Sequence, residues 1–534
     1  MTATAIDTLT DEPQVQDERL EHIVIVGAGI SGIAMAIELQ RRGIDDFCLL
    51  EASDRPGGTW RDNNYPGVAV DIPSLSYCFP FEPNPDWSRL FAPGAEIYRY
   101  IEHCVDKYDI RRRIRFGARV NQAVFDPARA LWSLHLTDGR RIQARYVVVA
   151  TGILNQPKLP EIAGRDDFRG RMFHTNRWDQ GYDLAGKRVA IIGTGASAAQ
   201  VVPAIARDVA RLDVWQRTPI WVLPKLDIRF PARLRRVFRA MPMLQRLMRA
   251  PIDGGLEMGY WATVYHRHLP GLTRLAERNS LKLLASQVSD PALRDKLTPH
   301  YGFGCKRPAV SSEYWATFER DNVTLRTEGI ESIDAEGIID GQGAHHRYDA
   351  IILATGFKTQ EIGNNPSFEV HGLDGLELGR FWHEHRYQAF NGVSVPRFPN
   401  LFLTFGPYSG GLNWFTMIGA NGRFIGRCLQ KADRSGARYV EVRRSYHDRY
   451  LALMHKKARN TLFQNGPCQG ANSYYFDRHG DASLPTPFAP IWRWFRVRVT
   501  GLQSHRFERE IPPVVASRGD LAQLGATGPE GGSA

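Results

Sequence analysis

Two glycine-rich turns of one type occur in this chain, and each can hold the pyrophosphate of a dinucleotide. The first reads Gly-Ala-Gly-Ile-Ser-Gly at 27–32, and the second reads Gly-Thr-Gly-Ala-Ser-Ala at 193–198. Glycine allows a tight turn and close approach of the backbone to phosphate, while the N-terminus of the following helix favours an anion. The residues predicted to bind dinucleotides in this way are Gly27, Gly29, Gly32, Gly193, Thr194, Gly195, Ala196, Ser197, Ala198 and Gln200.

The residue that contacts the ribose differs between the two turns. Glu51 and Arg217 each follow the first glycine of their turn by 24 residues, at the end of the next apolar strand. A carboxylate there accepts hydrogen bonds from ribose hydroxyls, whereas an arginine pairs with a 2′-phosphate. The chain is therefore predicted to bind FAD at the first turn and NADPH at the second, with Thr218 and Lys306 beside Arg217. This combination predicts a flavoprotein oxidoreductase.

Parallel sheets are needed to position these turns, and the apolar pattern around each turn predicts one. The expected strands are 22–26, 47–50 and 146–150 in the first unit, and 188–192, 212–216 and 349–354 in the second. Each unit ends in a strand followed by Thr-Gly, which indicates two similar folds with one inserted in the other. The spacing of apolar residues within 231–297 is typical of helices, expected to pack on their own domain rather than lie on a membrane. The predicted fold class is α/β, with two nested Rossmann-like dinucleotide-binding domains and a helical insertion.

The domain boundaries follow from these landmarks. In chain order, the expected segments are a disordered N-terminal segment (1–20), the first part of the FAD-binding domain (21–152), a linker (153–186), the first part of the NADP-binding domain (187–224), the helical insertion (225–300), the second part of the NADP-binding domain (301–357), the second part of the FAD-binding domain (358–511) and a flexible tail (512–534). Each nucleotide-binding domain is thus expected to be built from two separate stretches of chain.

Composition places the chain among ordinary globular proteins large enough for two or more domains. It has 534 residues, of which 43% are hydrophobic and 23% charged, and its net charge of +11 suits two anionic cofactors. The basic clusters match no nucleic-acid-binding motif, so no nucleic-acid partner is expected. No segment approaches the ~20 apolar residues of a membrane span, and the N-terminus lacks the apolar core of a signal peptide. These features predict a cytoplasmic protein, and they leave its oligomeric state open.

Six cysteines are spread along the chain without a C-x-x-C pair. Their spacing argues against a disulfide framework and a zinc ribbon, and no metal site is expected. The dithiol that thioredoxin-reductase-type flavoenzymes use as a redox relay is missing as well. The cysteines therefore predict a reducing compartment.

Three further segments resemble type I Baeyer–Villiger monooxygenases, which are class B flavoprotein monooxygenases dependent on FAD and NADPH. The linker sequence Phe-Arg-Gly-Arg-Met-Phe-His-Thr-Asn-Arg-Trp-Asp at 168–179 resembles the family fingerprint F-x-G-x-x-x-H-x-x-x-W-(P/D). Gly-Gly-Thr-Trp at 57–60, followed by Tyr-Pro-Gly at 65–67 and by Asp71, is a second match. Lys-Arg-Pro at 306–308 is the third.

The resemblance implies a monooxygenase that uses NADPH and O2 to insert one oxygen atom next to a ketone carbonyl, giving an ester or lactone via a C4a-peroxyflavin. Arg307 is implied to be catalytic, because a fixed guanidinium stays charged and stabilises the oxyanion that forms when the peroxide adds to the carbonyl. Asp71 is implied to steady Arg307, and both residues also belong to the expected cofactor site. A small apolar ketone is the implied substrate, and linear, cyclic, aromatic and steroidal ketones all stay open.

The resemblance also assigns roles around the flavin, in the linker and near the C-terminal part. The residues implied to contact FAD are Gly58, Thr59, Trp60 and Tyr77 near the flavin ring and Val120 at the adenine end. His174 and Trp178 of the linker are implied to couple nicotinamide binding to the reaction. The glycine- and aromatic-rich loop 408–415 is implied to line the substrate pocket, through Tyr408, Trp414 and Phe415.

Three other functions share parts of this pattern. An N- or S-oxygenating flavin-containing monooxygenase has both nucleotide sites but keeps the peroxide protonated, and Arg307 and Trp178-Asp179 argue against it. A simple NADPH oxidase or diaphorase needs no substrate pocket, and the aromatic loop after Pro407 argues against that function. A non-enzymatic redox sensor would signal through a further domain or an interaction tail, which the sequence does not indicate.

Overall fold

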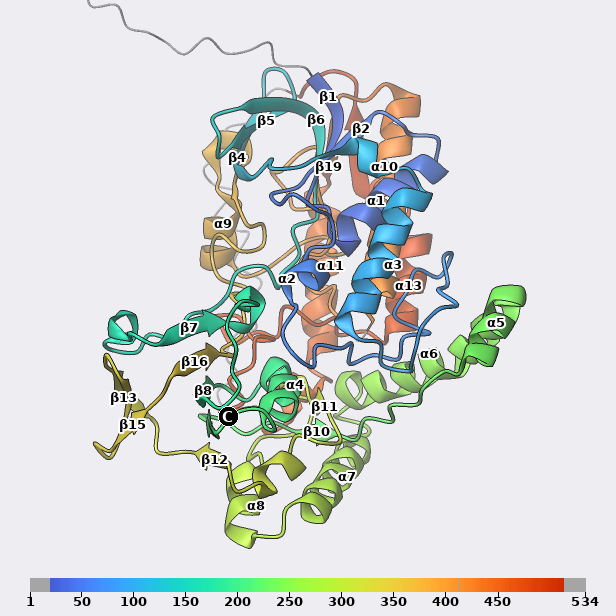
Figure 1. Cartoon of the computed structure of the whole chain (residues 1–534). Coiled ribbons are helices and arrows are strands. Elements are labelled where there is room, and N and C mark those ends of the chain that lie inside the picture. Colours follow the sequence, from blue (N-terminus) through green and yellow to red (C-terminus); the bar gives the residue numbers. More distant parts are fainter. Residues whose placement is uncertain (1–19, 412, 513–534) are drawn as a thin grey trace, which may run out of the picture.

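The polypeptide forms two lobes, each built around its own β-sheet (Figure 1). The computed structural model describes residues 20–411 and 413–512. The expected disordered segment and flexible tail, 1–20 and 512–534, lie outside the described residues except for Leu20 and Pro512. The first lobe combines the early part of the chain with the C-terminal part, and the second lobe lies between them in sequence.

An eight-stranded sheet forms the framework of the first lobe, in the order β17-β4-β5-β6-β1-β2-β3, with β18 paired to β6. Its strands are β1 (Leu20–Val26), β2 (Phe47–Leu50), β3 (Ile114–Arg115), β4 (Val120–Asp126), β5 (Leu131–Leu136), β6 (Arg141–Val149), β17 (Glu369–His371) and β18 (Leu401–Leu403). β1 pairs in parallel with β2 and β6, and β18 returns from the C-terminal part to pair with β6. The three strands predicted for the first unit are therefore present, and the chain re-enters the first fold after the second.

Helices cover this sheet and complete the first lobe. They are α1 (Ile30–Arg41), α2 (Thr59–Asp62), α3 (Gly94–Lys107), α9 (Leu378–His385), α10 (Trp414–Ser435), α11 (Arg444–Ala458), α12 (Leu462–Asn465) and α13 (Pro490–Val499). A two-stranded antiparallel ribbon joins β19 (Tyr439–Val442) to β20 (His505–Glu508).

Alternate side chains of β1 point to opposite faces of the sheet and enter two different hydrophobic cores. Ile23 and Ile25 pack with residues of α1, α3 and α10. Val24 and Val26 pack with residues of β4, β5 and α9. Because both faces of β1 are covered, the glycine turn that follows the strand has a fixed position at the carboxyl edge of the sheet.

The second lobe contains a five-stranded parallel sheet in the order β12-β9-β8-β16-β7. Its strands are β7 (Arg171–His174), β8 (Arg188–Ile192), β9 (Arg211–Trp215), β12 (Val323–Arg326) and β16 (Ala350–Leu353), with α4 (Ala196–Ile205) following β8. The three strands predicted for the second unit are present. β7 comes from the segment expected as a linker, and it extends this sheet by pairing with β16. A small antiparallel sheet joins β13 (Ile330–Ile333), β14 (Gly337–Asp340) and β15 (His345–Arg347).

The helical insertion leaves and re-enters the second lobe at one point. It comprises α5 (Ala232–Ala240), α6 (Pro242–Val264), α7 (Pro270–Gln287) and α8 (Pro291–Leu297). Two short strands, β10 (Val222–Leu223) and β11 (Ala309–Val310), pair in parallel at its two ends. This pairing brings the chain after Arg217 beside the chain after Arg307. α5 and α6 reach outward from the body of the molecule (Figure 1).

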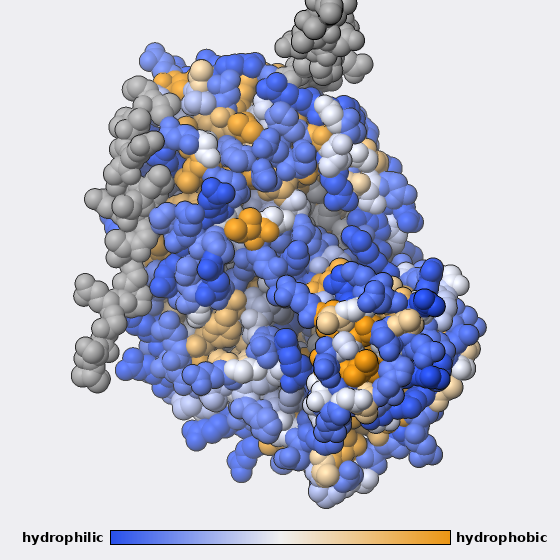
Figure 2. Space-filling view, turned by 90° about the vertical axis from the view of Figure 1, so that its left-hand side faces the viewer, coloured by the Kyte–Doolittle hydropathy of each residue, from blue (hydrophilic) through white to orange (hydrophobic). Residues whose placement is uncertain are grey.

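The face that carries β7 and β16 is mostly hydrophilic, with apolar side chains gathered in separate patches (Figure 2). Among the described residues, no helix has both the length and the apolar character that crossing a bilayer requires.

One disulfide bond joins Cys305 to Cys468, with their Cα atoms 5.2 Å apart. This bond was not expected from the sequence, because 163 residues separate the two cysteines and no local motif marks the pair. The fold brings them together where the second lobe meets the C-terminal part of the first. The other four cysteines, Cys48, Cys78, Cys104 and Cys428, are buried free thiols.

Candidate active site between the two nucleotide-binding units

The first glycine turn fits closely between β1 and β6. Gly27 has φ +109°, and a Cβ atom there would lie 2.7 Å from the carbonyl oxygen of Ala150. A Cβ atom on Gly32 would lie 1.9 Å from the carbonyl oxygen of Gly27. Gly29 is the N-cap of α1, so the free N–H groups of that helix face the turn. These positions therefore exclude side chains and leave the backbone open to a phosphate.

Glu51 lies directly against this turn, at the end of β2. Its Oε2 accepts a hydrogen bond from the backbone N–H of Ala28 at 2.8 Å. Its Oε1 accepts from Ser53 N and from Arg61 Nη1, each at 3.0 Å. The carboxylate is 5% exposed and held by three donors beside the position expected for the ribose.

The segment after Gly58 places aromatic residues near the first turn. Gly58 is the N-cap of α2, and a Cβ atom there would lie 3.1 Å from Cα of Gly29. Trp60 Nε1 donates to the hydroxyl of Tyr77 at 3.2 Å, and burial raises the pKa of Tyr77 above its ordinary value. Thr59 begins α2, while Val120 is buried at the start of β4. The residues assigned to the flavin thus come from three different segments.

The second glycine turn repeats the geometry of the first. Gly193 has φ +113°, and a Cβ atom there would lie 2.4 Å from the carbonyl oxygen of Ala354. Gly195 is the N-cap of α4, which begins with Ala196 and Ser197 and buries Ala198. Thr194 Oγ1 donates to the carbonyl oxygen of Thr218 at 2.6 Å. This hydrogen bond ties the turn to the segment that carries Arg217.

Gln200 of α4 binds the first lobe in this structure. Its Oε1 accepts from the hydroxyl of Tyr65 at 3.1 Å and from Ala69 N at 3.3 Å, and its Nε2 donates to Ala69 O at 3.0 Å. A Cβ atom on Gly67 would lie 2.5 Å from the carbonyl oxygen of Gln200. The loop that carries the second family motif is therefore in direct contact with the helix of the second turn, and the two nucleotide-binding units meet here.

Two cations lie together on the second lobe. Arg217 is exposed at the end of β9, and Lys306 is half-buried before β11. Burial, aided by the positive charge of Arg217, lowers the pKa of Lys306 to about 8. The positive charge of a lysine is destabilised by a neighbouring arginine. A phosphate dianion between the two side chains would offset the repulsion between their charges.

Arg307 and Asp71 form a two-pronged ion pair between the lobes. Arg307 Nε donates to Asp71 Oδ2 at 2.7 Å, and Arg307 Nη2 donates to Asp71 Oδ1 at 2.7 Å. The side chains are 25% and 23% exposed, respectively. Burial opposes the charge of Arg307, but the charge and hydrogen bonds of Asp71 outweigh it and raise the pKa of the guanidinium. The arginine is therefore permanently charged and fixed in orientation.

Two tyrosines missed by the sequence analysis adjoin Arg307. The rings of Tyr474 and Tyr475 lie 4.9 Å apart, and both residues interact electrostatically with Arg307. Burial raises the pKa of Tyr475, so its hydroxyl stays neutral. Both tyrosines pack on an apolar cluster that includes Trp414 and Met417. The sequence signal was available in the run Tyr-Tyr-Phe at 474–476, which follows a glycine-rich stretch.

The structure separates the three residues assigned to the substrate pocket. Trp414 stacks on Phe405 with ring centroids 4.3 Å apart, in the apolar cluster beside the two tyrosines. Phe415 is fully buried and contacts Tyr77 at a centroid distance of 4.9 Å. Tyr408 is 3% exposed and belongs to the core of the first lobe. Only Trp414 of the three therefore lies in the cluster that adjoins Arg307.

His174 and Trp178 do not share a helix face. His174 ends β7, and a single 3₁₀ turn at Thr175–Arg177 separates it from Trp178. Burial lowers the pKa of His174 to about 4, so the imidazole is neutral at physiological pH. Its ring lies 5.6 Å from that of Phe357, just after the Thr-Gly that ends the second unit. Trp178 packs against Phe173 at 5.0 Å.

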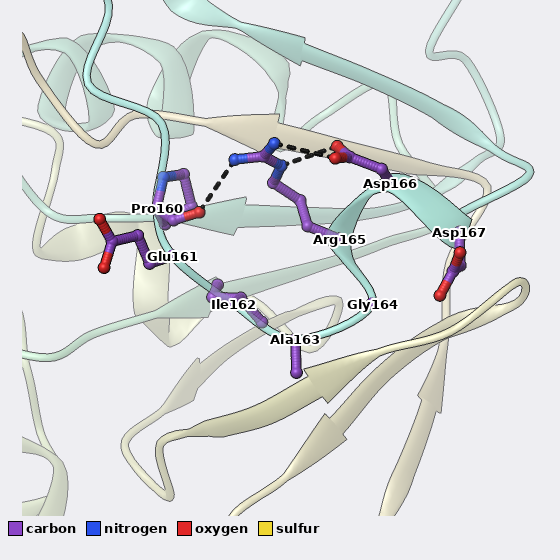
Figure 3. A pocket seen from close by; sticks show the side chains of 8 residues that line it. All are labelled: Pro160, Glu161, Ile162, Ala163, Gly164, Arg165, Asp166 and Asp167. Atoms are coloured by element: carbon purple, nitrogen blue, oxygen red, sulfur yellow. Dashed lines mark hydrogen bonds and ion pairs between the residues drawn. The ribbon is translucent and has the colours of Figure 1, made fainter.

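A surface hollow in the linker is unrelated to this site (Figure 3). All its lining residues belong to the single segment 160–167. Its arginine, Arg165, is already bound to Asp166 at 2.9 Å and to the carbonyl oxygen of Pro160 at 3.1 Å. The only arginine that lines the hollow is already paired, and none of the lining residues belongs to either glycine turn, so the hollow lacks the features of a dinucleotide site.

Comparison with known proteins identifies relatives along almost the whole chain. Residues 24–231 match the family model described as pyridine nucleotide-disulphide oxidoreductase. The chain is 38% identical over 518 residues to a Baeyer-Villiger monooxygenase of Pseudomonas aeruginosa, and the match covers 96% of each protein. It is 35% identical over 513 residues to a Baeyer-Villiger monooxygenase of Streptomyces coelicolor, covering 95% of this chain and 96% of that protein.

Solved structures of oxygenating enzymes share the fold. Cyclohexanone monooxygenase from Rhodococcus sp. Phi1 bound to NADP+ has a TM-score of 0.81 at 25% identity, covering 92% of this chain and 100% of that chain. Oxidized steroid monooxygenase bound to NADP has a TM-score of 0.80 at 27% identity, with the same coverage of 92% and 100%. The predicted α/β fold with two Rossmann-like units is confirmed.

Proposed function

The chain belongs to the Baeyer–Villiger monooxygenase family, and on that premise we propose how its residues insert oxygen beside a ketone carbonyl to give an ester or lactone. The enzyme uses FAD, NADPH and O2. The observation that carries the residue assignment is the Asp71–Arg307 ion pair, which joins the two nucleotide-binding units. N- or S-oxygenation is the less favoured alternative.

The first unit fits FAD. At Gly27 and Gly32 of its turn, a Cβ atom would clash with backbone carbonyl groups. The N-terminus of α1 faces the space where a pyrophosphate would bind. Glu51 places its carboxylate at the end of β2, where it can accept from the ribose hydroxyls. We assign the flavin end to the region of Gly58, Thr59 and Trp60, and assign Tyr77 and Val120 to the same cofactor.

The second unit fits NADPH. Gly193 and Gly195 repeat the turn, and α4 supplies the helix N-terminus. Arg217 and Lys306 converge through the pairing of β10 with β11, and two cations suit the 2′-phosphate that distinguishes NADPH from NADH. We assign Thr194, Thr218 and the first turn of α4 to the same nucleotide. Gln200 takes a second role in our assignment, because its amide also holds the first lobe against α4.

When both cofactors are bound, the nicotinamide supplies hydride and the flavin supplies the activated oxygen. Arg307 is assigned to stabilise negative charge that develops on the carbonyl oxygen of the ketone, because a fixed guanidinium directs several N–H donors at one anion. Asp71 accepts from Nε and Nη2, and the Tyr475 hydroxyl also interacts with the guanidinium, so the remaining N–H groups are assigned to that task. His174, neutral and packed against Phe357 beside the Thr-Gly ending, is assigned to couple the linker to the second unit.

The apolar surroundings of Arg307 point to an apolar ketone. The cluster beside Tyr474 and Tyr475 contains Phe405, Trp414 and Met417. Such a surface binds hydrocarbon and excludes water, which strengthens the electrostatic effect of the arginine on the reacting group. A cytoplasmic location stays a proposal from the sequence, and the Cys305–Cys468 disulfide does not accord with the reducing compartment that the scattered cysteines predicted.

The experiment that tests this function measures NADPH consumption with a panel of linear, cyclic, aromatic and steroidal ketones, alongside the mass of the product. We expect ketone-dependent consumption and an ester or lactone that carries one added oxygen. A panel of amines and thioethers tests the alternative. Rapid oxygenation of those compounds without any ester from ketones would overturn the proposal in favour of N- or S-oxygenation.

A further inference from the structure

Cys305, which forms the disulfide with Cys468, lies two residues before Arg307 in sequence. Cys305 is fully buried, and Cys468 belongs to the loop 466–476 of the C-terminal part. The bond therefore joins the turn that carries Lys306 and Arg307 to a segment of the other lobe.

The turn and the loop also fit each other without the covalent bond. Gly302 N donates to the carbonyl oxygen of Pro467 at 2.9 Å. Gly304 has φ +93°, and a Cβ atom there would lie 2.9 Å from Cδ2 of Leu462. The glycines thus let the turn approach the segment 462–467 more closely than other residues would allow. Because this contact is already made, two thiols at Cys305 and Cys468 would stay close together.

In addition to the disulfide, the loop 466–476 contacts the segment of Thr218 and the turn of Arg307, which both belong to the second nucleotide site. Asn472 Nδ2 donates to the hydroxyl of Thr218 at 2.8 Å. Tyr474 and Tyr475 adjoin Arg307 and its ion pair with Asp71. A constraint at Cys468 therefore acts on the segment that contacts the arginine expected to stabilise the adduct and the threonine expected beside the nucleotide.

We propose that Cys305 and Cys468 are a reversible thiol–disulfide modification site, oxidised by hydroperoxides and reduced by dithiols, which fixes the loop 466–476 against the Arg307 turn. In the oxidised form, the loop 466–476 is fixed beside the nicotinamide-nucleotide site. In the reduced form, the loop is more mobile and the site is less ordered. This inference rests on the proposed NADPH-dependent function, since it assigns that site a redox control.

The chemistry proceeds in two balanced steps. Cys468 is partly exposed and Cys305 is not, so the Cys468 thiolate is the group that attacks hydrogen peroxide, giving a sulfenic acid and water. The Cys305 thiolate then attacks that sulfur, forms the S–S bond and releases a second water. Overall, two thiols lose two protons and two electrons, and one peroxide becomes two waters. A dithiol reverses the change by thiol–disulfide exchange, becoming a disulfide itself.

The other cysteines are poor sites for this reaction. Cys48 and Cys78 are buried, and burial raises their thiol pKa values to about 12 and about 11. Cys428 is buried within α10, and burial raises its thiol pKa to about 12. Since the thiolate is the reactive form, mild oxidants should spare these residues, whereas the equally buried Cys305 needs no contact with the oxidant because it attacks the adjacent sulfur of Cys468.

The test compares the FAD-loaded wild type in two states, after incubation with dithiothreitol or with stoichiometric hydrogen peroxide. Peptide mapping by mass spectrometry identifies the linked Cys305 and Cys468 peptides. Chymotrypsin cleavage after Tyr474 and Tyr475 reports the mobility of the loop, and titration with NADP+ reports the nucleotide site without turnover. We expect the linked peptide only after peroxide, together with cleavage at least several-fold slower and NADP+ affinity several-fold tighter than in the reduced protein.

Cys468→Ser and Cys428→Ser provide a matched pair. Cys468→Ser should behave like reduced wild type in both buffers, while Cys428→Ser should respond to peroxide as wild type does. If Cys468→Ser fails to fold, the two states of the wild type still decide the matter. A missing linked peptide, or a linked peptide with unchanged cleavage and affinity, would overturn the inference. A redox-dependent NADP+ affinity in a protein that oxygenates no ketone would instead overturn the proposed function and leave this site standing.

Discussion

Arg307 and Asp71 are 236 positions apart in the chain, yet two hydrogen bonds of 2.7 Å join them. Asp71 follows the family motif of the first unit, and Arg307 follows the helical insertion of the second. Their ion pair therefore fixes one unit relative to the other at the place where a flavin and a nicotinamide are expected to meet. The pair is not the only contact between the units, because Gln200 of α4 also binds Tyr65 and Ala69 of the first lobe, so the two cofactors can stay aligned without it.

Replacing Arg307 by alanine should separate the two halves of the reaction. Hydride transfer needs only aligned cofactors, so the flavin should still bleach when NADPH is added. Oxygen insertion should fall by about 10²–10³-fold, because loss of a preorganised donor to a developing oxyanion has that typical cost. Stopped-flow absorbance follows flavin reduction, and product analysis follows the ester and hydrogen peroxide.

The expected signature of this variant is NADPH consumption with peroxide in place of ester. A normal ester yield would show that Arg307 has no part in oxygen insertion. Loss of flavin reduction alone would move Arg307 to the nucleotide-binding set. Arg165→Ala is a suitable control, because that arginine pairs with Asp166 in the linker hollow and should leave both half-reactions intact.

Arg217→Ala should weaken NADPH far more than NADH. The side chain is exposed at the end of β9, where a 2′-phosphate is expected, and a charge-assisted hydrogen bond contributes about 1.5–3 kcal/mol. The KM for NADPH should therefore rise roughly ten- to a hundred-fold, with the KM for NADH almost unchanged. Steady-state kinetics with both coenzymes is the measurement, and equal losses would mean that Arg217 does not contact the phosphate.

Coenzyme preference should also depend on pH through Lys306. Burial lowers the pKa of this lysine to about 8. A lysine is charged below its pKa and neutral above it, so the attraction for the 2′-phosphate is present at low pH and is lost as the pH rises. The KM for NADPH should rise between about pH 7 and 9, and that for NADH should not follow it. In Lys306→Arg the guanidinium stays charged, so the pH dependence should flatten. The same rise with NADH would exclude Lys306 as its cause.

Gly32→Ala should abolish FAD retention, because the added Cβ atom would lie 1.9 Å from the carbonyl oxygen of Gly27. The backbone of the turn must then move away from the geometry that holds a pyrophosphate. Gly254→Ala in α6 is the control, since a Cβ atom there meets nothing within 4 Å. Purified wild type and control should be yellow and release FAD rather than FMN, and a yellow Gly32→Ala protein with full flavin content would contradict the assignment.

The glycine turns and their strands were predictable from the sequence because these features are local, and the nesting of the two units was predictable because the strand followed by Thr-Gly occurs twice. Gly27 and Gly193 have positive φ angles and oppose backbone carbonyls, so the residue type itself signals the geometry. Glu51 and Arg217 were located because each follows the first glycine of its turn by 24 residues, where the next strand ends. The position of Arg307 came from the family resemblance, and the β10–β11 pairing gives its physical reason.

Long-range contacts were not predictable in this way. Cys468, Tyr474 and Tyr475 reach Arg307 only because the C-terminal part of the chain folds back onto the second lobe. The aromatic pattern of loop 408–415 likewise does not reveal that Phe415 and Tyr408 fill the core while Trp414 faces another cluster. The side-chain direction in that loop depends on tertiary packing, which neither spacing nor composition encodes.

Asp71→Asn tests whether the carboxylate acts through Arg307. Asparagine keeps the size of the side chain but offers one acceptor oxygen and an NH2 group, so it cannot receive both donors of the guanidinium. We expect ester formation to fall roughly ten- to a hundred-fold, as the loss of about 1.5–3 kcal/mol of charge-assisted hydrogen bonding predicts, with flavin content and flavin reduction unchanged.

A double-mutant cycle makes this test decisive. If Asp71 works by orienting Arg307, the arginine-free background has nothing left for it to orient, and Asp71→Asn combined with Arg307→Ala should lose no more ester-forming rate than Arg307→Ala alone. Independent roles would instead give losses that multiply. Single-turnover ester yield from pre-reduced enzyme is the appropriate readout, because it excludes coenzyme binding and flavin reduction from the comparison. Multiplied losses would show that Asp71 contributes to oxygen insertion by a route that does not pass through Arg307.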